Sequence, residues 1–395
     1  MQTVGVRPAR GVIEVNQETI VHLKTDTMKK YSLITLMVFL TGMLVFTACE
    51  NDFNGTGTED SILPEQLTVE IPSSLSRDLT VKKSSQVDTL KGGEIYRHLT
   101  FFIHTGEHAA RLVRHVILAI RVHHIDRVKT VTYVSEDDGR IKNLVVFEAP
   151  EFDGRIWEYG LTITDAGSEE NEDGGKAMQI FWNRDPREGV TLINPYNLDR
   201  TGECKMAGAM FRIDYSAAGE LGYEHYMTVS IAGLPAVDPL LAPFCMDGMK
   251  MFAGRKGDHV DVYGNSSHPN AKFLTEKVGY NWAFVAAGSK SRDIGVAEVG
   301  LPLSTVDAED RSVLLGEYSI YNVLYNEVKT VWPHASDELL DAWLTNTQAP
   351  GYFNGDGFIR GGTSPGDEFL PLVDRIGDLT PYNPKTIAGL EIRFN

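Results

Sequence analysis

Short runs of β-branched and aromatic residues dominate the middle of the chain. Each run has the length of a strand, and segments rich in Gly, Asp or Asn separate several of them, as hairpin turns would. The strands expected from this pattern cover residues 130–134, 144–147, 156–164, 177–182, 189–193, 209–215, 226–231, 259–263, 282–286 and 296–299. No helix of crossover length lies between them, so the pattern predicts a mainly antiparallel sheet.

A helix before the sheet and a helical segment after it complete the predicted fold. One apolar helix face with i, i+3, i+4, i+7 spacing is formed by Ala109, Leu112, Val113, Val116, Ile117 and Ile120. Thr105 is the expected N-cap and the helix should end near Asp126, while 99–103 has the composition of a strand. Further helices are expected at 307–315, 319–331 and 336–345, and a last strand at 387–394. We therefore expect an α+β fold, in which a curved, mainly antiparallel sheet carries an N-terminal packing helix and a C-terminal helical segment on one side.

The longest uncharged stretch lies close to the N-terminus. It covers residues 32–48, follows two lysines after Met28, and is followed directly by Cys49. A short basic region, an apolar region and a small residue before the cleavage point are the parts of a secretory signal. A transmembrane anchor is the alternative, but 17 residues is at the lower end of what spans a bilayer. The sequence therefore predicts export, with residues 1–27 as an upstream extension.

The residues around Cys49 resemble the signal of Bacteroidetes-type outer-membrane lipoproteins. The segment Phe46-Thr47-Ala48-Cys49 is similar to a bacterial lipobox, with Phe in place of the more usual Leu, and Glu50 and Asp52 resemble the acidic export tags of surface lipoproteins. The resemblance covers about residues 28–90. It implies that Cys49 carries lipid, including palmitate, and is the first residue of the mature protein. It also implies an outer-membrane location facing the periplasm or the cell exterior.

These features divide the chain into four parts. Ser, Thr, Asp and Gly are frequent between the signal and the first expected helix, which is typical of a flexible tether. The expected parts are the extension 1–27, the signal peptide 28–48, the tether 49–93 and a single α+β domain 94–395, which is β-rich over 94–303, helical over 304–346 and loop-rich over 347–395. A split near residue 304 is the alternative, because one domain of this length is larger than average.

Charge and cysteine content narrow the function. The chain has 37 Lys+Arg against 54 Asp+Glu, a formal net charge of −17, so no nucleic-acid partner is expected. Three cysteines are too few for a disulfide scaffold or a multi-cysteine metal site. Outside the cytoplasm Cys204 and Cys245 can form a disulfide, and two buried free thiols are the alternative.

The densest group of histidines lies just before the sheet. The segment His104-Thr105-Gly106-Glu107-His108 resembles the H-x-x-E-H motif of inverted zinc peptidases. The resemblance implies that His104 and His108 bind the metal and that Glu107 activates water. Gly106 is a poor helix former, and a helix capped by Thr105 would leave His104 outside it. Since no second motif supplies a third ligand, we expect surface or capping histidines and no cofactor, with the zinc site as the alternative.

The remaining motifs carry less chemistry. The segment 362–366 has the G-x-S-x-G spacing of a nucleophile elbow, but Pro365 lacks the N–H that an oxyanion hole needs there. The acidic segments 169–173 and 354–357 lack the spacing of a twelve-residue calcium loop and are expected to be solvated loops. Trp157 and Trp282 lie in alternating strands and are expected in the core. The side chains available to stack on sugar rings are Trp157, Trp182, Trp282, Trp332 and Trp343.

We therefore expect a non-catalytic domain that binds a ligand or a partner. The ligand is a glycan or another nutrient, and the partner is a protein of an envelope complex. Exposed aromatic and polar side chains on a concave sheet face would favour this hypothesis, whereas a convergent His/Glu site would favour a zinc-dependent hydrolase. A carrier of an apolar ligand, with the N-terminal helix plugging a half-barrel, is the third option.

Overall fold

The computed structural model describes most of the chain after residue 66. The described residues are 67–76, 92–121, 129–201, 208–235, 245–306, 310–379, 387 and 390–395. The expected signal peptide, Cys49 and Cys204 lie outside them. Export, lipidation and the disulfide therefore stay predictions.

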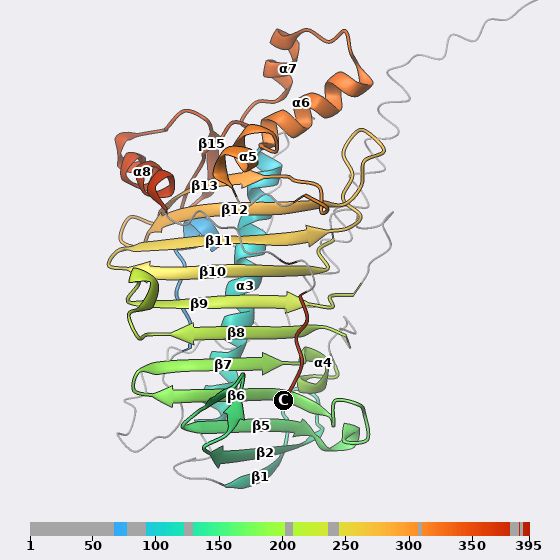
Figure 1. Ribbon diagram of the computed structural model, residues 1–395, viewed down its shortest axis with the longest axis vertical. Coiled ribbons are helices and arrows are strands. Elements are labelled where there is room, and N and C mark those ends of the chain that lie inside the picture. Colours follow the sequence, from blue (N-terminus) through green and yellow to red (C-terminus); the bar gives the residue numbers. More distant parts are fainter. Residues whose placement is uncertain are drawn as a thin grey trace, which may run out of the picture.

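One antiparallel sheet of thirteen strands forms the body of the described chain (Figure 1). The strands lie side by side in the order that they have in the sequence, and each neighbouring pair is antiparallel. They are β1 (Thr130–Val134), β2 (Ile141–Glu148), β5 (Tyr159–Asp165), β6 (Lys176–Arg184), β7 (Arg187–Ile193), β8 (Met210–Ser216), β9 (His225–Ala232), β10 (Gly248–Lys256), β11 (His259–His268), β12 (Tyr280–Ser289), β13 (Ile294–Gly300), β14 (Gly351–Asn354) and β15 (Gly357–Gly361). A separate hairpin joins β3 (Glu151–Phe152) to β4 (Arg155–Ile156). The predicted antiparallel α+β class is confirmed, although the sheet outweighs the helices.

Three strands of the thirteen-stranded sheet lie where the sequence pattern predicts none. β10 contains Met, Gly and Lys rather than a β-branched run, and its pairing with β9 and β11 overrides this weak local preference. β14 and β15 form a hairpin within 347–395, which was expected to be loop-rich. At the far end, the described residues 390–395 form no strand, so the strand expected at 387–394 is wrong for them.

The helices are short, with one exception. They are α2 (Ser73–Ser76), α3 (Gly92–Arg121), α4 (Pro195–Leu198), α5 (Arg311–Gly316), α6 (Ile320–Val331), α7 (Asp337–Trp343) and α8 (Leu370–Asp378), with 3₁₀ turns at Ala166–Ser168, Glu220–Gly222 and Asp367–Phe369. The helical segment predicted after the sheet is confirmed by α5, α6 and α7. Side chains cap all three starts, because Asp310, Ser319 and Ser336 accept hydrogen bonds from backbone N–H groups in the first turns.

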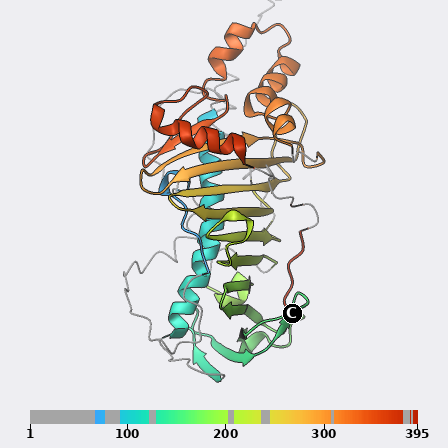
Figure 2. The same ribbon diagram turned by 60° about the vertical axis from the view of Figure 1, so that its left-hand side comes forward.

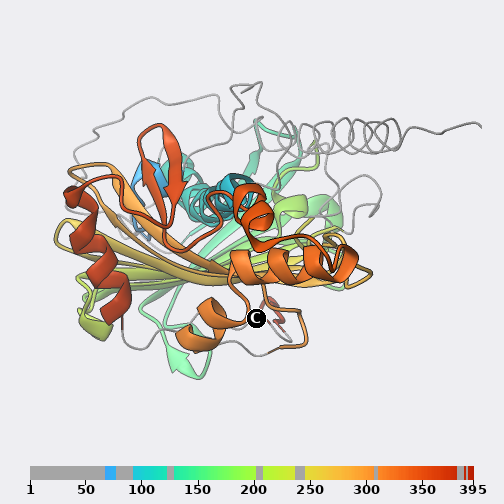
Figure 3. The same cartoon turned by 90° about the horizontal axis from the view of Figure 1, so that it is seen from above.

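The long helix α3 crosses one face of the sheet, here called the inner face (Figures 1 and 2). Figure 3, where α3 is seen almost along its axis, shows it on one side of the strands. Thirty residues make a helix about 45 Å long, and strands lie about 4.8 Å apart, so α3 can span about nine strands. Leu99, Phe102 and Val113 belong to the same buried cluster as Trp182 and Phe284 of the sheet. The helix is therefore the main cover of the inner core.

The predicted start of this helix is wrong. Residues 99–103 are helical rather than a strand, and Thr105 lies inside α3, where its hydroxyl donates to the Phe101 carbonyl at 2.9 Å. A short apolar run fits a buried helix as well as a strand, and tertiary packing decides between them. Gly106 is explained by the same packing, because a Cβ at this position would lie 2.6 Å from the Cε of Met251. The missing side chain allows the helix to approach β10 closely.

Part of the expected tether belongs to the fold. Residues 67–76 are described and contribute the buried side chains of Leu67, Val69, Ile71 and Leu75 to the inner core. At the end of this segment, the Ser74 N–H donates to the Asp293 carboxylate at 2.9 Å. The packed chain thus begins before residue 94, and only residues outside 67–76 and α3 are left for the tether.

The opposite, outer face is covered at two places, so the expectation of helices on one side is wrong. At one place α8 packs Leu372 and Ile376 against Val285 and Val296 in one buried cluster. Arg375 fixes α8 there by donating to both oxygens of the buried Asp261 carboxylate at 2.5 and 2.7 Å. At the other place, the last residues of the chain and the β3–β4 hairpin cover Phe181, Val190 and Leu192 with Phe152, Trp157 and Ile392.

Candidate functional site

The histidine pair of the proposed zinc motif lies on one continuous helix. Because α3 begins at Gly92, His104 is inside it, and the expectation that the pair is separated is wrong. The rings of His104 and His108 lie with their centroids 6.0 Å apart. The Nδ1 atom of His104 is 2.7 Å from the Ser76 carbonyl oxygen, so one ring nitrogen is already used within the fold.

Glu107 does not complete a metal site with these histidines. Burial raises the pKa of its carboxyl group, which forms an ion pair with the Arg111 guanidinium at 3.7 Å. Among the described residues, no group of three or more His, Cys, Asp or Glu side chains could hold a metal ion. The arrangement is a local pairing between α3 and the segment 67–76, and the zinc hypothesis lacks a third ligand in the described part of the chain.

A buried ionic cluster near β1 was not predicted from the sequence. Lys142 is 1% exposed, and its ammonium group donates to Asp138, Asp165 and the Asn197 carbonyl at 2.8 to 2.9 Å. The Arg140 guanidinium donates to both oxygens of Asp165 and holds the pKa of that carboxyl group well below its usual range. Since the members of this cluster neutralise one another, we assign it to the stability of the β2–β5 end.

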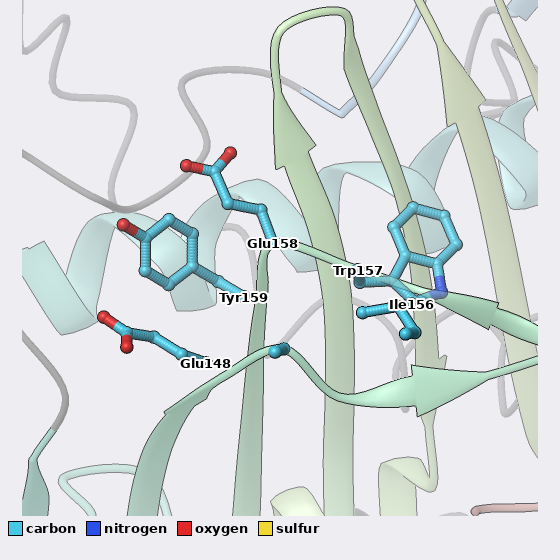
Figure 4. Close-up of a pocket in the computed structure, with 6 residues that line it drawn as sticks. Glu148, Ile156, Trp157, Glu158 and Tyr159 are labelled. Atoms are coloured by element: carbon cyan, nitrogen blue, oxygen red, sulfur yellow. The ribbon is translucent and has the colours of Figure 1, made fainter.

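One hollow of about 460 Å³ lies beside the β3–β4 hairpin. Figure 4 shows the Tyr159 ring between the carboxylates of Glu148 and Glu158, with Trp157 and Ile156 on the other side of the backbone. Arg184 already donates to Glu158 at 2.8 Å. The Trp157 indole is 4% exposed, so its ring is not available for stacking. The hollow therefore offers an exposed carboxylate and an aliphatic side chain, without converging groups.

The other motifs of the sequence are turns or isolated side chains. Residues 354–357 make the turn between β14 and β15, and 169–173 lie in the loop between β5 and β6. The Ser364 hydroxyl of the G-x-S-x-G segment donates to the Gly366 carbonyl at 2.7 Å. Cys245 is partly exposed in the structure, and Cys204 lies outside the described residues.

The tryptophans separate into two groups by exposure. Trp157, Trp182 and Trp282 are 4, 0 and 1% exposed, which confirms the core positions predicted for Trp157 and Trp282. Trp332 and Trp343 are 50 and 40% exposed. A tryptophan buries roughly 150–250 Å² when covered, so half exposure leaves about 2 kcal/mol of hydrophobic free energy unrealised per ring. Such exposure is typical of a binding surface.

The two exposed indoles meet at a right angle. Trp332 follows the last residue of α6, and Trp343 is the last residue of α7. Their ring centroids are 6.3 Å apart and their planes differ by 80°, so the two ring faces form an open corner. Val331 and Leu339, which are 41 and 43% exposed, add aliphatic surface on the same two helices. We call these four residues the tryptophan corner.

Hydrogen bonds between α6 and α7 hold this corner in shape. The Tyr321 hydroxyl donates to Asp341 at 2.6 Å, and the Tyr325 hydroxyl donates to Asp337 at 2.9 Å. Lys329 lies 2.8 Å from Asp337 as well. The Lys329 and Tyr325 contacts hold the pKa of Asp337 below its usual range, whereas the contact with Asp341 raises the pKa of Tyr321 to about 12. The helical hairpin is thus tied together by groups that remain on its surface.

The hairpin is also anchored to the sheet. Glu327 of α6 is 2% exposed, and its carboxylate accepts from the Leu274 and Thr275 N–H groups and from the Thr275 hydroxyl at 2.7 to 3.1 Å. Ile320 and Leu324 extend the inner core into α6. In Figures 1 and 2, α6 and α7 lie at the end of the molecule farthest from β1, beyond the last strands. The tryptophan corner therefore projects from a fixed support.

A second hollow lies beside this hairpin. It has a volume of about 360 Å³ and is lined by residues of β13, α5, α6, α8 and the loop before β14, among them Glu298, Arg311, Tyr321 and Gln348. Arg311 donates to both oxygens of the nearly buried Glu298 at 2.9 and 2.7 Å. Tyr321 contributes both to this hollow and to the α6–α7 hairpin, so polar groups continue from one to the other.

The tryptophan corner could be predicted only in part from the sequence. It predicts both helices and includes Trp332 and Trp343 among the stacking candidates, but it expects the exposed aromatics on a concave sheet face. Instead, α3 covers the inner face, and the exposed rings lie at the ends of two helices. Trp343 follows Leu339 by four residues, which places them on one helix face, but spacing alone does not tell an exposed face from a buried one.

Neither similarity to known proteins nor a membrane-spanning helix identifies a function for the chain. No helix among the described residues is long and apolar enough to cross a membrane. No family model, curated protein or solved structure matches the chain. The function has to be inferred from the geometry.

Proposed function

We propose that the chain is an exported, lipid-anchored envelope protein whose domain binds neutral glycan without catalysis, through the tryptophan corner. The observation that carries this proposal is the exposure of Trp332 and Trp343 at a right angle on a braced hairpin. Every other tryptophan of the chain is in the core.

The chemistry of the corner suits a sugar ring. The face of an indole carries negative π density and attracts the polarised C–H groups on one face of a pyranose, while it also excludes water from that face. Two faces at a right angle can contact two neighbouring sugar units, or two sides of a branched one. The hydroxyl and carboxylate groups of the Tyr325–Asp337 and Tyr321–Asp341 pairs lie on the same hairpin and can exchange hydrogen bonds with sugar hydroxyls.

The charge of the chain favours a neutral ligand. The net charge is −17, and Asp337, Glu338 and Asp341 add negative charge to α7 itself. An acidic polysaccharide or a phosphate-rich surface would be repelled by this field. A neutral polysaccharide has no such penalty.

The lipid anchor rests on the N-terminal sequence. The basic, apolar and small-residue pattern that ends at Cys49, followed by Ser- and Thr-rich sequence, supports export and attachment to the outer membrane. Labelling of cells with radioactive palmitate should mark the wild-type chain and should not mark Cys49→Ala. Equal labelling of both chains would remove the lipidation site from the proposal and leave the glycan site untouched.

Affinity electrophoresis tests the glycan site. Native gels are cast with neutral polysaccharides that cover the common backbones, such as xylan, glucomannan, galactomannan and mixed-linkage glucan. At least one should retard the wild-type protein, and Trp343→Ala and Trp332→Ala should each weaken retention about tenfold or more, because truncating a tryptophan at the centre of a binding site typically costs about 2 kcal/mol or more and each 1.4 kcal/mol is tenfold in affinity. Polygalacturonate, which is anionic, should have no effect.

Two variants serve as controls for this experiment. Ile156→Ala removes an exposed aliphatic side chain, 71% exposed, from the β3–β4 hairpin and should be retained as the wild type is. Trp343→Phe keeps an aromatic face and should recover part of the retention. If no neutral polysaccharide retards the wild type, the glycan proposal is wrong, and if both alanine variants are retained normally, the binding site lies elsewhere.

A further inference from the structure

The strand β1 is one of the two ends of the sheet. It pairs with β2 on one side, and within the described part of the chain no strand pairs with its other side. Its sequence, Thr-Val-Thr-Tyr-Val, contains no charged residue, no proline and no glycine. Thr130, Thr132 and Val134 are exposed along it.

The backbone of β1 alternates between its partner strand and the open side. The Val146 N–H donates to the Lys129 carbonyl at 3.0 Å, and the Ser135 N–H donates to the Arg140 carbonyl at 2.9 Å. In an antiparallel pair, alternate residues direct their N–H and C=O groups toward the same neighbour. The odd-numbered residues of β1 therefore bond to β2, while Thr130, Thr132 and Val134 direct their backbone groups outward.

The two ends of the sheet differ in how they are protected. Natural sheets commonly block pairing at an edge with charge, proline, a bulge or a covering element. The hairpin of the far edge, β14–β15, has a register irregularity at Tyr352/Phe353, and β15 carries Arg360 and two glycines. Within the described part of the chain, β1 has none of these features. Val134 of β1 and its β2 neighbours Ile141 and Val145 are 62, 52 and 37% exposed, so this edge presents apolar surface.

We propose that β1 pairs antiparallel with β1 of a second copy of this chain, so that two sheets join into one across a two-fold axis at Thr132. In this register Thr132 exchanges both backbone hydrogen bonds with Thr132 of the partner subunit, and Thr130 does so with Val134 of the partner subunit. Within one copy, Ile141 of β2 lies beside Val134 of β1, and Val145 of β2 lies beside Thr130 of β1. Across the axis Val134 lies beside Thr130 of the partner subunit, so the exposed side chains of the two copies form one row on the outer face. Of the three apolar side chains exposed in the single chain, Val134 gains a direct neighbour, Thr130 of the partner subunit, while Ile141 and Val145 lengthen the row on either side.

The charges that flank β1 favour pairing with a second copy in antiparallel orientation. Lys129 directly precedes β1, and Glu136, Asp137 and Asp138 follow it after one residue. An antiparallel pair places Lys129 of each copy near the acidic turn of the other. A parallel pair would instead place the two acidic turns together, and like charges side by side are unfavourable. The inference is independent of the glycan site, which lies at the opposite end of the molecule (Figure 1).

Light scattering coupled to size-exclusion chromatography tests this pairing on the purified full chain. The wild type should have twice the mass of one chain across a dilution series. Thr132→Pro removes only an outward N–H, which an edge strand tolerates on its free side, and it should give the mass of one chain with an unchanged circular dichroism spectrum. Thr132→Lys places two ammonium groups opposite each other across the axis and should also give one chain mass.

Two control variants locate the contact. Thr132→Val keeps a β-branched side chain and every backbone group, and should remain a dimer. Ile359→Lys adds a charge at an exposed position of β15, the other edge, and should remain a dimer as well. A single-chain mass for the wild type overturns the inference. A dimer that persists in folded Thr132→Lys overturns it too, because the contact would then lie on another surface; this variant decides the matter if Thr132→Pro does not fold.

Discussion

Four tryptophans illustrate two opposite uses of one residue type. Trp182 of β6 and Trp282 of β12 lie on the inner face of the sheet, at 0 and 1% exposure. Trp182 stacks on Tyr159 with centroids 5.6 Å apart, and Trp282 meets Phe102 of α3 edge-on at 6.0 Å. Trp332 and Trp343 form an edge-on pair of nearly the same separation, 6.3 Å, yet each is 40% exposed or more.

The difference comes from what surrounds each pair and not from the ring contact. A strand in the middle of a sheet has a neighbour on both sides, and a long helix crosses above it, so an inward aromatic has no route to water. The end of a short helix has neighbours on one side only. The geometry of an aromatic pair at helix ends therefore depends on the contacts that hold the two helices together. The geometry of an aromatic pair in a sheet depends on the side chains packed around it.

The largest expected effect is on the buried side of this comparison. Trp182→Ala should lower the free energy of unfolding by about 3–5 kcal/mol, because it opens a cavity in a core that the helix cannot refill. Urea unfolding followed by circular dichroism measures the change. A loss below about 1 kcal/mol would show that the inner core collapses around the deletion and that the two tryptophan groups differ less than proposed.

The second largest effect is a dependence of stability on pH that arises from His98 of α3, also in the buried body of the molecule. Burial lowers the pKa of His98 on α3 to about 4, from the usual 6.5. Between these values the unfolded chain binds a proton that the folded chain does not, so stability should fall as the pH falls from 6.5 to about 4. Over this pH range His98→Gln should reduce the fall in the free energy of unfolding by on the order of 1–3 kcal/mol. Urea unfolding at a series of pH values measures this difference. Parallel pH profiles for the two proteins would contradict the assignment.

A smaller effect on stability is expected at the tryptophan corner. Trp332→Ala and Trp343→Ala should each lower the free energy of unfolding by no more than about 2 kcal/mol, because only about half of each ring is buried. The same two proteins should lose retention in the polysaccharide gels. If either substitution destabilises the chain as strongly as Trp182→Ala does, the corner is part of the core and its loss of binding carries no information about a site.

The smallest expected effect is at the histidine pair of α3. Removal of metal with EDTA and the substitution His108→Ala should leave the melting temperature unchanged, and elemental analysis of protein purified without chelator should show less than one zinc per chain. The reason is that the described residues supply no third ligand. If the wild type contains one zinc per chain and His108→Ala contains none, the hydrolase hypothesis is restored, and the functional site lies on α3 rather than on the α6–α7 hairpin.

Much of the sheet was predictable from the sequence, because most strands are β-branched runs between turn residues. β1 was predicted to the residue, and Trp157 and Trp282 were placed in the core. The start of α3 was not predictable, since 99–103 is an apolar run too short to show a period. β10 was missed because Met, Gly and Lys have little strand preference, and long-range pairing provides what local preference lacks.

The candidate site was predictable only as a set of residue types. The sequence includes Trp332 and Trp343 among five stacking candidates, but exposure depends on what the rest of the chain covers. The packing of Leu340 and Leu344 turns Leu339 and Trp343 outward, and this orientation requires the position of α7 against α6. The bond from Glu327 to the turn before β12 joins residues 52 positions apart, which no local pattern reveals.

The strand order of the sheet has a consequence for how the chain folds. Most strands pair with the next strand in the sequence; the exceptions are β2–β5, which encloses the β3–β4 hairpin, and β13–β14, which encloses α5, α6 and α7. Most of the sheet therefore forms from pairings of low contact order, which favours fast folding. The helix α3 is different: it is made before every strand, yet it packs against β8, β9 and, some 240 residues later, β15. A chain that leaves a membrane pore N-terminus first would expose this helix until its last partner arrives. We therefore expect docking of α3 to be the late, slow step of folding and, if the proposed export takes place, the step most in need of protection after it.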